Sequence, residues 1–269
     1  MNKYFNQNKL IIITGASSGI GKSLTSYLIK KYSLTVVGIG RNEENLNSLV
    51  KEFNDNFIPF KMDVSQKEEW LKLESYLQTL PNKPSGLINC AGVLPDFLAF
   101  EKVKEETVYQ VFNVNFFSII FSCQTILPIL KTQQNPILIN VSSSSSLCPF
   151  AGVSLYSSSK AAVKNFSESL SVEKNGVKVV TVMPGFTKTD VMRSIKRSRK
   201  EQRLIDKISL SPDKVAKKII KKASKGKVRI ITGIDAHFMN FLYKFFPKTA
   251  PKFLSWFLRK TKLDMFKKI

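Results

Sequence analysis

Short apolar runs recur at intervals along the chain. Gly, Asn, Pro or charged residues flank each run. Runs that are apolar on both faces are typical of strands in a parallel sheet that is covered on both sides. The pattern predicts seven strands: Leu10–Ile13, Leu34–Ile39, Phe57–Phe60, Leu87–Asn89, Ile137–Val141, Val177–Met183 and Val228–Thr232.

The segments between these runs show the spacing of amphipathic helices. The last of these helices has two start signals, Ser211 as N-cap and Pro212 at the first helical position. Strands that alternate with helices this often indicate an α/β fold with a doubly wound parallel sheet. The predicted helices span about residues 19–31, 43–54, 67–79, 101–131, 156–173 and 213–225.

The chain changes character after the last predicted strand. Aromatic and leucine side chains recur at helical spacing before Pro247, and a second apolar group follows it, interleaved with Lys252, Arg259 and Lys260. We therefore predict a domain of residues 1–235 and an extension of residues 236–269 that forms two short amphipathic helices. Residues 193–209, which are polar and basic, are predicted to form a loop or a short helix.

The net charge of +22 on 269 residues is concentrated near the C-terminal end. Residues 191–269 hold 23 Lys and Arg against 5 Asp and Glu. This charge indicates either a partner with an anionic surface or a solvated face in a lysine-rich chain. No nucleic-acid-binding motif accompanies it, and the cations are mixed with aromatic residues, so we expect no nucleic-acid partner.

We expect a cytoplasmic protein without a transmembrane span. We count no apolar run of 18 residues without charge, and the polar N-terminus lacks the features of a signal peptide. Cys90, Cys123 and Cys148 are odd in number and lack metal-binding spacing. They are therefore predicted to be free thiols in a reducing compartment, and no metal site is expected.

A glycine-rich turn joins the first predicted strand to the first helix. It reads Thr14-Gly15-Ala16-Ser17-Ser18-Gly19-Ile20-Gly21. Gly15 permits a tight turn, Gly19 lets the backbone approach a pyrophosphate, and Gly21 allows the helix to pack closely on the strand. The helix N-terminus adds free N–H groups and the positive end of the helix dipole. This turn predicts a dinucleotide-binding site, and a tight turn without a ligand is the alternative.

The end of the second strand indicates which dinucleotide binds. An acidic residue there would hold the ribose 2′-hydroxyl of NAD, but the sequence reads Ile39-Gly40-Arg41-Asn42. The planar guanidinium of Arg41 suits a 2′-phosphate, and Ser17 could add a hydrogen bond. We therefore predict NADP(H), with a simple surface charge as the alternative for Arg41.

Tyr156 and Lys160 are four residues apart, which places them on one face of the same predicted helix. Ser143 lies 13 residues before the tyrosine, just after the fifth strand. Open α/β sheets bind ligands at the carboxyl ends of their strands, so these three side chains could face one cleft. Other serines surround Ser143, which is therefore selected by spacing alone.

At this point the chain resembles the short-chain dehydrogenase/reductase (SDR) family over about residues 8–235. The resemblance implies a Rossmann-like fold and an oxidoreductase that transfers hydride between nicotinamide and a carbonyl/alcohol pair. One departure is Asn89-Cys90-Ala91-Gly92, where the family has Asn-Asn-Ala-Gly. The matching pieces are Thr14–Gly21, Asp63-Val64, Asn89–Gly92, Asn115, Ser143, Tyr156, Lys160 and Pro184-Gly185-Phe186-Thr187-Lys188-Thr189.

The resemblance also implies four catalytic roles. Tyr156 would be the general acid or base, and Lys160 would lower its pKa and hold the nicotinamide ribose. Ser143 would hydrogen-bond the substrate oxygen. Asn115 would hold a water that passes protons to Lys160, with a structural role in the helix as the alternative.

The resemblance further implies the cofactor contacts. Asp63 and Val64 would cap the adenine, and Thr187 and Thr189 would bind the carboxamide. The full set is Gly15, Ser17, Ser18, Gly19, Ile20, Gly21, Arg41, Asp63, Val64, Asn89, Ala91, Gly92, Tyr156, Lys160, Pro184, Gly185, Thr187 and Thr189.

Substrate and partners are less defined. Apolar residues surround the catalytic pair, which is compatible with an apolar or lipid-like substrate; they are Leu94, Phe97, Leu147, Pro149, Phe150, Val153, Leu155 and Met192. The extension 236–269 could form a substrate lid, a structural or subunit contact, or a basic amphipathic surface for an anionic membrane. The resemblance implies a homodimer or homotetramer through helices near 101–131 and 156–173. A catalytically silent cofactor-sensing scaffold and a protein that binds anionic surfaces remain as alternatives.

Overall fold

The seven predicted strands are all present. The structure is a computed structural model that describes residues 3–173, 176–189 and 209–261. Residues 193–208 of the predicted loop, and Met192, lie outside the described residues. The strands are β1 (Leu10–Thr14), β2 (Thr35–Gly40), β3 (Phe57–Lys61), β4 (Pro84–Asn89), β5 (Ile137–Val141), β6 (Lys178–Pro184) and β7 (Arg229–Thr232).

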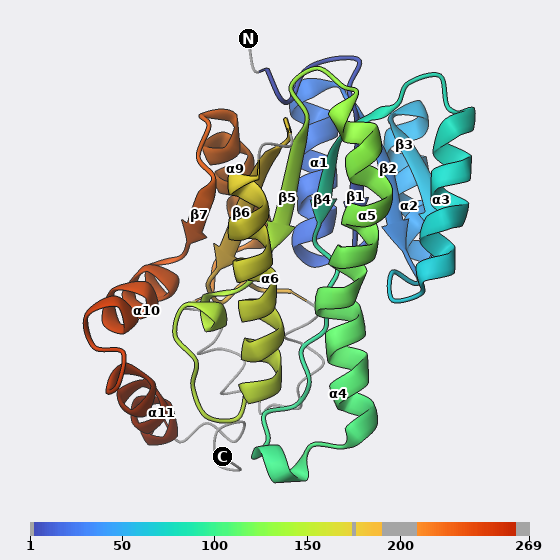
Figure 1. The fold of residues 1–269 in the computed structure, drawn as a ribbon. Coiled ribbons are helices and arrows are strands. Elements are labelled where there is room, and N and C mark those ends of the chain that lie inside the picture. Colours follow the sequence, from blue (N-terminus) through green and yellow to red (C-terminus); the bar gives the residue numbers. More distant parts are fainter. Residues whose placement is uncertain (1–2, 174–175, 190–208, 262–269) are drawn as a thin grey trace.

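The strands form one parallel sheet in the order β3-β2-β1-β4-β5-β6-β7 (Figure 1). The chain moves outward from β1 to β3 and then returns to place β4 on the other side of β1. The connections on the two sides of this reversal leave a crevice at the carboxyl ends of β1 and β4, where such sheets bind ligands.

Helices cover both faces of this sheet. One face carries α1 (Gly19–Tyr32), α2 (Glu43–Phe53) and α9 (Pro212–Ser224), and the other carries α3 (Lys67–Thr79), α5 (Ser118–Lys131) and α6 (Ser154–Val172). Side chains of β1 alternate between the two cores: Ile11 and Ile13 pack against the first set, Leu10 and Ile12 against the second. Both faces are thus apolar, as the strand pattern predicts.

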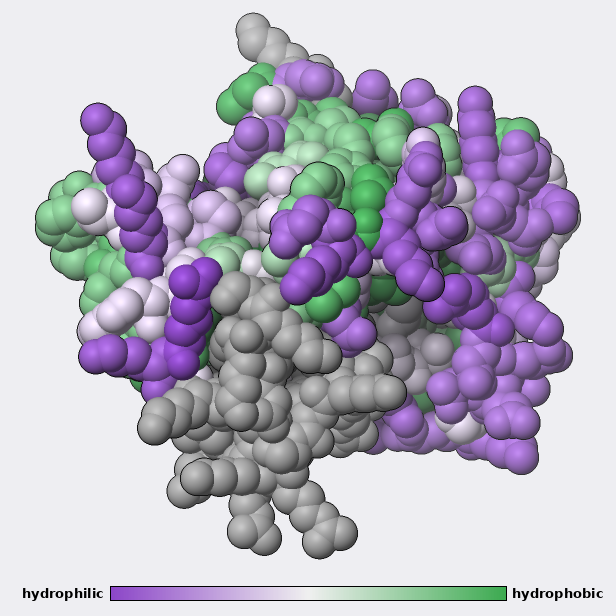
Figure 2. All heavy atoms as spheres, turned by 90° about the horizontal axis from the view of Figure 1, so that it is seen from below, coloured by the Kyte–Doolittle hydropathy of each residue, from purple (hydrophilic) through white to green (hydrophobic). Residues whose placement is uncertain are grey.

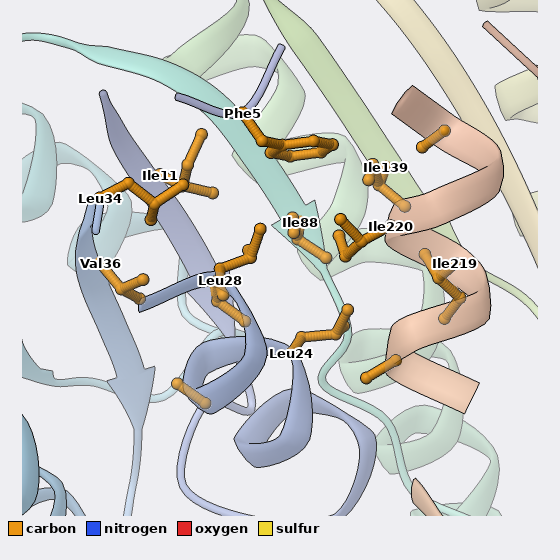
Figure 3. Close-up of a cluster of buried hydrophobic side chains, with 14 of the residues drawn as sticks. Phe5, Ile11, Leu24, Leu28, Leu34, Val36, Ile88, Ile139, Ile219 and Ile220 are labelled. Carbon is orange, nitrogen blue, oxygen red and sulfur yellow. The ribbon is translucent and has the colours of Figure 1, made fainter. Parts of the chain in front are cut away.

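Phe5 closes the first core at the N-terminal end of the chain. Its ring lies near Leu28 of α1 and Ile220 of α9 (Figure 3), and all three side chains are fully buried. The core therefore ties the first and the last helix of the sheet domain together beneath the glycine-rich turn.

The helix predicted for residues 101–131 is interrupted. A 3₁₀ turn (Phe100–Lys102) precedes α4 (Glu105–Phe112), and a π-helical turn (Asn113–Phe117) separates α4 from α5. One part of the sequence prediction is wrong here, because residues 107–130 carry no charge. The stretch Glu105–Lys131 is long and apolar enough to cross a membrane by length and composition. In this fold α5 contacts β4 and α3, which explains its apolar character.

The two C-terminal helices form as the spacing predicts. They are α10 (Ile234–Phe245) and α11 (Ala250–Lys260), with Pro247 between them. Met239 of α10 and Leu254 of α11 pack with Cys148 in a small separate core. The extension is thus attached to the loop that follows β5, beside the lower end of the sheet in Figure 1.

Candidate active site

A cavity of about 390 Å³ lies at the carboxyl ends of the strands. Its walls come from the segments that follow β1 to β6. The predicted site residues that line it are Gly15, Ser17, Ser18, Gly19, Ile20, Gly21, Arg41, Asp63, Val64, Ala91, Gly92, Ser143, Tyr156, Lys160, Pro184, Gly185, Thr187 and Thr189. Asn89 and Asn115 are not in this lining, and Asn45, Met62, Cys90 and Phe186 join it without having been predicted.

The glycine-rich turn has the backbone that its glycines permit. Gly15 and Gly19 have φ angles of 68° and 49°, in the left-handed region. A Cβ on Gly21 would collide with the carbonyl oxygen of Gly15, so only glycine lets α1 approach this closely. Ser18 is the N-cap of α1, but its side chain does not cap the helix, and the first turn holds no acidic residue. The helix end is therefore available to an anion.

Arg41 follows β2 at the edge of the cavity and is exposed. The nearest carboxylate, Glu43, does not line the cavity and instead accepts a 2.7 Å hydrogen bond from Lys61. Asn42 is likewise engaged, because its side chain caps α2 by accepting from the N–H of Asn45. Among the described residues Arg41 has no ion-pair partner, which leaves its guanidinium available to a ligand.

Asp63 follows β3 on the same side of the cavity. Its Oδ1 accepts from the backbone N–H and the hydroxyl of Ser65 at 2.9 and 2.7 Å. These bonds hold the turn after β3 in place and present Asp63 and Val64 to the cavity.

Tyr156 and Lys160 project from α6 into the cavity, as their spacing predicts. The Lys160 Nζ donates to the carbonyl oxygen of Val141 at 3.1 Å and lies 6.0 Å from the centre of the Tyr156 ring. Burial lowers the pKa of the Lys160 ammonium to about 8. Burial also raises the pKa of the Tyr156 hydroxyl, and a hydrogen bond with the Ser143 side chain opposes that rise.

The five consecutive serines after β5 have separate partners. The Ser142 hydroxyl donates to the Lys160 carbonyl oxygen at 2.7 Å, and the Ser146 hydroxyl donates to the Ser143 carbonyl oxygen at 2.6 Å. Ser143 itself caps the 3₁₀ turn Ser144–Ser146, since its Oγ accepts from the N–H of Ser145 at 3.2 Å. Only Ser143 is engaged with Tyr156, so the structure agrees with the selection by spacing.

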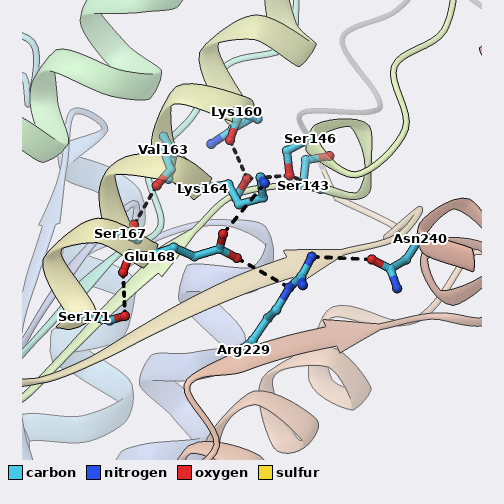
Figure 4. A network of polar contacts seen from close by, with 11 residues as sticks. Ser143, Ser146, Lys160, Val163, Lys164, Ser167, Glu168, Ser171, Arg229 and Asn240 are labelled. Carbon is cyan, nitrogen blue, oxygen red and sulfur yellow. Dashed lines mark hydrogen bonds and ion pairs between the residues drawn. The ribbon is translucent and has the colours of Figure 1, made fainter. Parts of the chain in front are cut away.

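A polar network fixes the helix that carries Tyr156 and Lys160 (Figure 4). Glu168 of α6 lies 3.8 Å from Lys164 on the same helix and 3.4 Å from Arg229 of β7. Arg229 also donates to Asn240 of α10 at 3.4 Å. These contacts join α6 to the edge of the sheet and to the C-terminal extension.

Asn115 lies in the π-helical turn and is fully buried. Its Oδ1 accepts from the N–H of Val93 at 2.7 Å, and its Nδ2 donates to the Val93 carbonyl oxygen at 2.9 Å and to Ser159 at 3.1 Å. A Cβ on Gly92 would lie 3.2 Å from both the Asn115 Oδ1 and the Lys160 Nζ. The π turn therefore aims Asn115 at the segment after β4, one residue's width from Lys160.

Asn89 requires a correction, because the prediction that it lines the cavity is wrong. Its Nδ2 donates to Asn140 of β5 at 2.9 Å, and Asn140 donates to Ser167 of α6 at 2.9 Å. The last residue of a strand alternates between the two faces of the sheet, and Asn89 points into the core under α6. It holds the strand that leads to the cavity.

Two residues that position the site were not found from the sequence. Thr14 accepts hydrogen bonds from the N–H groups of Cys90 and Ala91, both at 3.0 Å, which joins the ends of β1 and β4. Asp235 of α10 accepts from the N–H of Phe186 at 2.6 Å, which ties the loop after β6 to the extension. In the same loop Thr187 donates to the Gly185 carbonyl oxygen.

The remaining wall of the cavity, beyond Ser143 and Tyr156, is apolar. It is formed by Leu94, Phe97, Phe150 and Val153. The rings of Phe97 and Phe150 meet edge to face at 6.4 Å. Leu147 and Leu155, which were also expected near the substrate, are buried outside this lining.

Comparison with known proteins assigns the family. The model of the short chain dehydrogenases matches residues 9–200. The chain is similar to benzil reductase ((S)-benzoin forming) of Saccharomyces cerevisiae, with 31% identity over 201 residues that cover 71% of this chain and 76% of that protein.

Two solved structures share the fold. A short chain dehydrogenase from Burkholderia cenocepacia in complex with NADP has a TM-score of 0.77 and 20% identity, covering 90% of this chain and 95% of that one. A short chain dehydrogenase/reductase from Burkholderia phymatum in complex with NAD has a TM-score of 0.76 and 21% identity, covering 86% and 90%. With its seven-stranded parallel sheet and the family match over most of its length, the chain belongs to the short-chain dehydrogenase family of nicotinamide-dependent oxidoreductases.

Proposed function

We propose that this protein is an NADP(H)-dependent oxidoreductase that interconverts the carbonyl and alcohol forms of an apolar or lipid-like substrate. The observation that carries the proposal is one cavity with two differently equipped ends. One end holds the uncapped N-terminus of α1 and the free cation of Arg41, and the other holds Ser143, Tyr156 and Lys160 beside an apolar wall.

The residues of the cavity suit such a cofactor. The left-handed glycines and the open helix end would hold the pyrophosphate, and Asp63 and Val64 would flank the adenine. Thr187 and Thr189 would meet the carboxamide. Both NADP and NAD complexes share this fold, so the choice rests on this chain, where Arg41 rather than a carboxylate follows β2. When bound, NADPH would supply the hydride.

The proton chemistry rests on Tyr156. In reduction its hydroxyl donates a proton to the substrate oxygen, while the Ser143 hydroxyl hydrogen-bonds and polarises that oxygen. The positive charge of Lys160 stabilises the phenolate that remains, which offsets the rise in pKa that burial imposes on the tyrosine. Because the pKa of Lys160 is about 8, the lysine carries this charge at neutral pH. Asn115 acts as a positioning residue through Val93 and Ser159.

The apolar wall indicates the substrate class. Phe97, Phe150 and Val153 offer no hydrogen bond from their side chains, so a polar substituent facing them would lose its hydration without compensation. A carbonyl flanked by hydrocarbon or aromatic groups fits this wall. The three cysteines are free thiols, and we place the protein in the reducing cytosol. We further propose a homodimer or homotetramer through α4–α5 and α6.

Titration of the purified protein with NADPH and NADH, followed by nicotinamide fluorescence, tests the cofactor. We expect NADPH to bind about 10- to 100-fold more tightly than NADH, as loss of hydrogen bonds to a charged group costs roughly 1.5–3 kcal/mol. Arg41→Ala should remove this preference. Lys61→Ala is the matched control, since Lys61 is an exposed cation nearby that pairs with Glu43 outside the cavity, and it should keep the preference.

A panel of apolar and polar ketones and aldehydes with NADPH then tests the reaction. Reduction of apolar members that disappears in Tyr156→Phe supports the proposal. Tight NADPH binding with no turnover of any carbonyl would instead favour a cofactor-sensing scaffold, and equal binding of both dinucleotides would refute the role of Arg41.

A further inference from the structure

The C-terminal helices expose an unusual number of large apolar side chains. Among the described residues, 15 large hydrophobic residues are exposed, and nine of them lie between residues 234 and 257. Eight of these are aromatic, with exposed fractions from 40% to 56%. They are Phe238, Phe241, Tyr243, Phe245, Phe246, Phe253, Trp256 and Phe257. A surface this rich in aromatic residues marks an interaction site.

Helix α11 has two apolar faces. Ala250 and Leu254 are buried against the body of the protein. Phe253, Trp256 and Phe257 form a second stripe on the outward side, at the spacing that brings residues together on one face of a helix. Their rings contact one another, with centroids 6.0 and 6.4 Å from Phe253. The fold therefore uses one face of this helix and leaves the other without a partner in the described structure.

Helix α10 repeats this arrangement. Ala236 and Met239 are buried, whereas Phe238, Phe241 and Phe245 are exposed on the opposite side. The rings of Phe241 and Phe245 lie 4.9 Å apart. Figure 2 shows apolar side chains gathered at the left edge of the molecule, where Figure 1 places α10 and α11, with hydrophilic side chains around them.

Cations border the exposed aromatic stripes. Lys260 lies 4.4 Å from the centre of the Trp256 ring, and Lys244 lies 5.5 Å from that of Phe245. The exposed cations of the two helices and their connection are Lys244, Lys248, Lys252, Arg259 and Lys260. The only carboxylate between residues 234 and 261 is Asp235, which is turned inward to the N–H of Phe186. The surface is therefore apolar and strongly positive, with no exposed negative charge to oppose an anionic partner.

We infer that the outward faces of α10 and α11 form a docking surface for an anionic phospholipid bilayer. Aromatic side chains bury in the boundary between headgroups and acyl chains, and neighbouring Lys and Arg bind anionic headgroups. A protein partner of similar size would require acidic groups matched to each cation, whereas a bilayer offers both apolar depth and diffuse negative charge. This inference concerns the location of the protein and does not depend on the proposed reaction.

The docking surface is rigidly joined to the body of the protein next to the cavity. Ser255 of α11 accepts a 2.9 Å hydrogen bond from the N–H of Ala151, and Phe150 in the cavity wall packs against the small core of the extension. The surface is thus part of the folded domain and has a fixed orientation toward the apolar end of the cavity.

The two tryptophans of the chain make a direct test possible. Trp70 is fully buried and donates to the Val64 carbonyl oxygen, whereas Trp256 is 51% exposed. The full-length protein is titrated with vesicles of phosphatidylcholine alone, or of phosphatidylcholine with 30% phosphatidylserine. We expect a blue shift of tryptophan emission and co-sedimentation with the anionic vesicles only. Trp256→Phe should still co-sediment but lose the blue shift.

Two sets of variants separate this inference from binding through net charge. The triple change Phe253→Ser, Trp256→Ser, Phe257→Ser should weaken partitioning at least about tenfold. Lys252→Gln with Lys260→Gln should weaken it about tenfold or more. The matched control is Lys217→Gln with Lys218→Gln, which removes two exposed lysines of α9 where no large apolar side chain is exposed, and it should have little effect.

Three outcomes would overturn the inference. Vesicles with phosphatidylserine could leave the emission unchanged and the protein in the supernatant. The α9 variant could lose as much binding as the α11 variant, which would indicate net charge alone. Sedimentation velocity could show a dimer that dissociates in the triple serine variant while the wild type ignores vesicles, which would make a second copy of the chain the occupant.

Discussion

At the scale of single residues, the central feature of the site is a buried lysine. Burial lowers the pKa of Lys160 from its ordinary 10.5 to about 8. In the unfolded chain the lysine regains its ordinary pKa, so between pH 8 and 10.5 the unfolded state binds more protons than the folded state. The free energy of unfolding must then rise with pH through this window.

Lys160→Met should remove this dependence. From pH 7 to 9.5 the free energy of unfolding of the wild type should increase by about 2 kcal/mol more than that of the variant. Urea unfolding at both pH values measures the difference, and all other titrating groups are common to the two proteins. Lys164→Met, one turn further along α6 and outside the cavity lining, is the control and should follow the wild type. Parallel curves for Lys160→Met and the wild type would contradict this account.

Sequence spacing was sufficient for the residues that share one local element or one strand end. Tyr156 and Lys160 lie on one helix face, and Ser143 follows the neighbouring strand, so their meeting in one cavity could be predicted. Asp235 could not, because it contacts Phe186 across 49 residues from a segment with no predicted link to the site. Asn89 was misplaced because a motif gives the position of a residue but not the face of the sheet toward which it points.

At the scale of elements, a buried amide network joins β4, β5 and α6. Asn89 donates to Asn140, which donates to Ser167, and all three side chains are buried. Asn140→Ala should lower the free energy of unfolding by about 2–3 kcal/mol, because it leaves the amide of Asn89 without its partner in the core. Thermal or urea unfolding measures this change. Asn165→Ala, on the exposed side of α6, should stay within about 0.5 kcal/mol of the wild type.

The double variant tests whether the network acts as a unit. Combining Asn140→Ala with Asn89→Ala should cost about 1 kcal/mol less than the sum of the single changes, since each single change already breaks the shared bond. Strict additivity would show that the two amides stabilise the fold independently.

Element types were predicted more reliably than their interruptions. Every strand and both C-terminal helices appear close to their predicted bounds, because apolar periodicity records burial directly. The π turn at Asn113–Phe117 was missed, as its residues continue the helical spacing on both sides. Its cause lies in tertiary contacts, namely the hydrogen bonds that draw Asn115 to Val93, and no local pattern records them.

At the scale of the whole molecule, the extension and the sheet domain meet at the cavity. The sequence divides them near residue 235, and this division stays a prediction, but the contacts cross it. Arg229 of β7 joins Glu168 of α6 to Asn240 of α10, and Asp235 holds the loop after β6. A perturbation of α10 should therefore reach the residues proposed to hold the carboxamide.

Substitution of Asp235 tests this connection. Asp235→Ala leaves the N–H of Phe186 without its acceptor and frees the loop that carries Thr187 and Thr189. Loss of a hydrogen bond to a charged group costs roughly 1.5–3 kcal/mol, so the dissociation constant for NADPH should rise about 10-fold or more. Asp235→Asn retains a carbonyl oxygen at the same place and should raise it less than about threefold. Thermal unfolding recorded alongside separates the effect from general destabilisation, because loss of the carboxylate at the start of α10 alone should cost at most about 1 kcal/mol. Unchanged NADPH affinity in Asp235→Ala would mean that the loop holds its position without the extension, and that α10 serves the surface rather than the cavity.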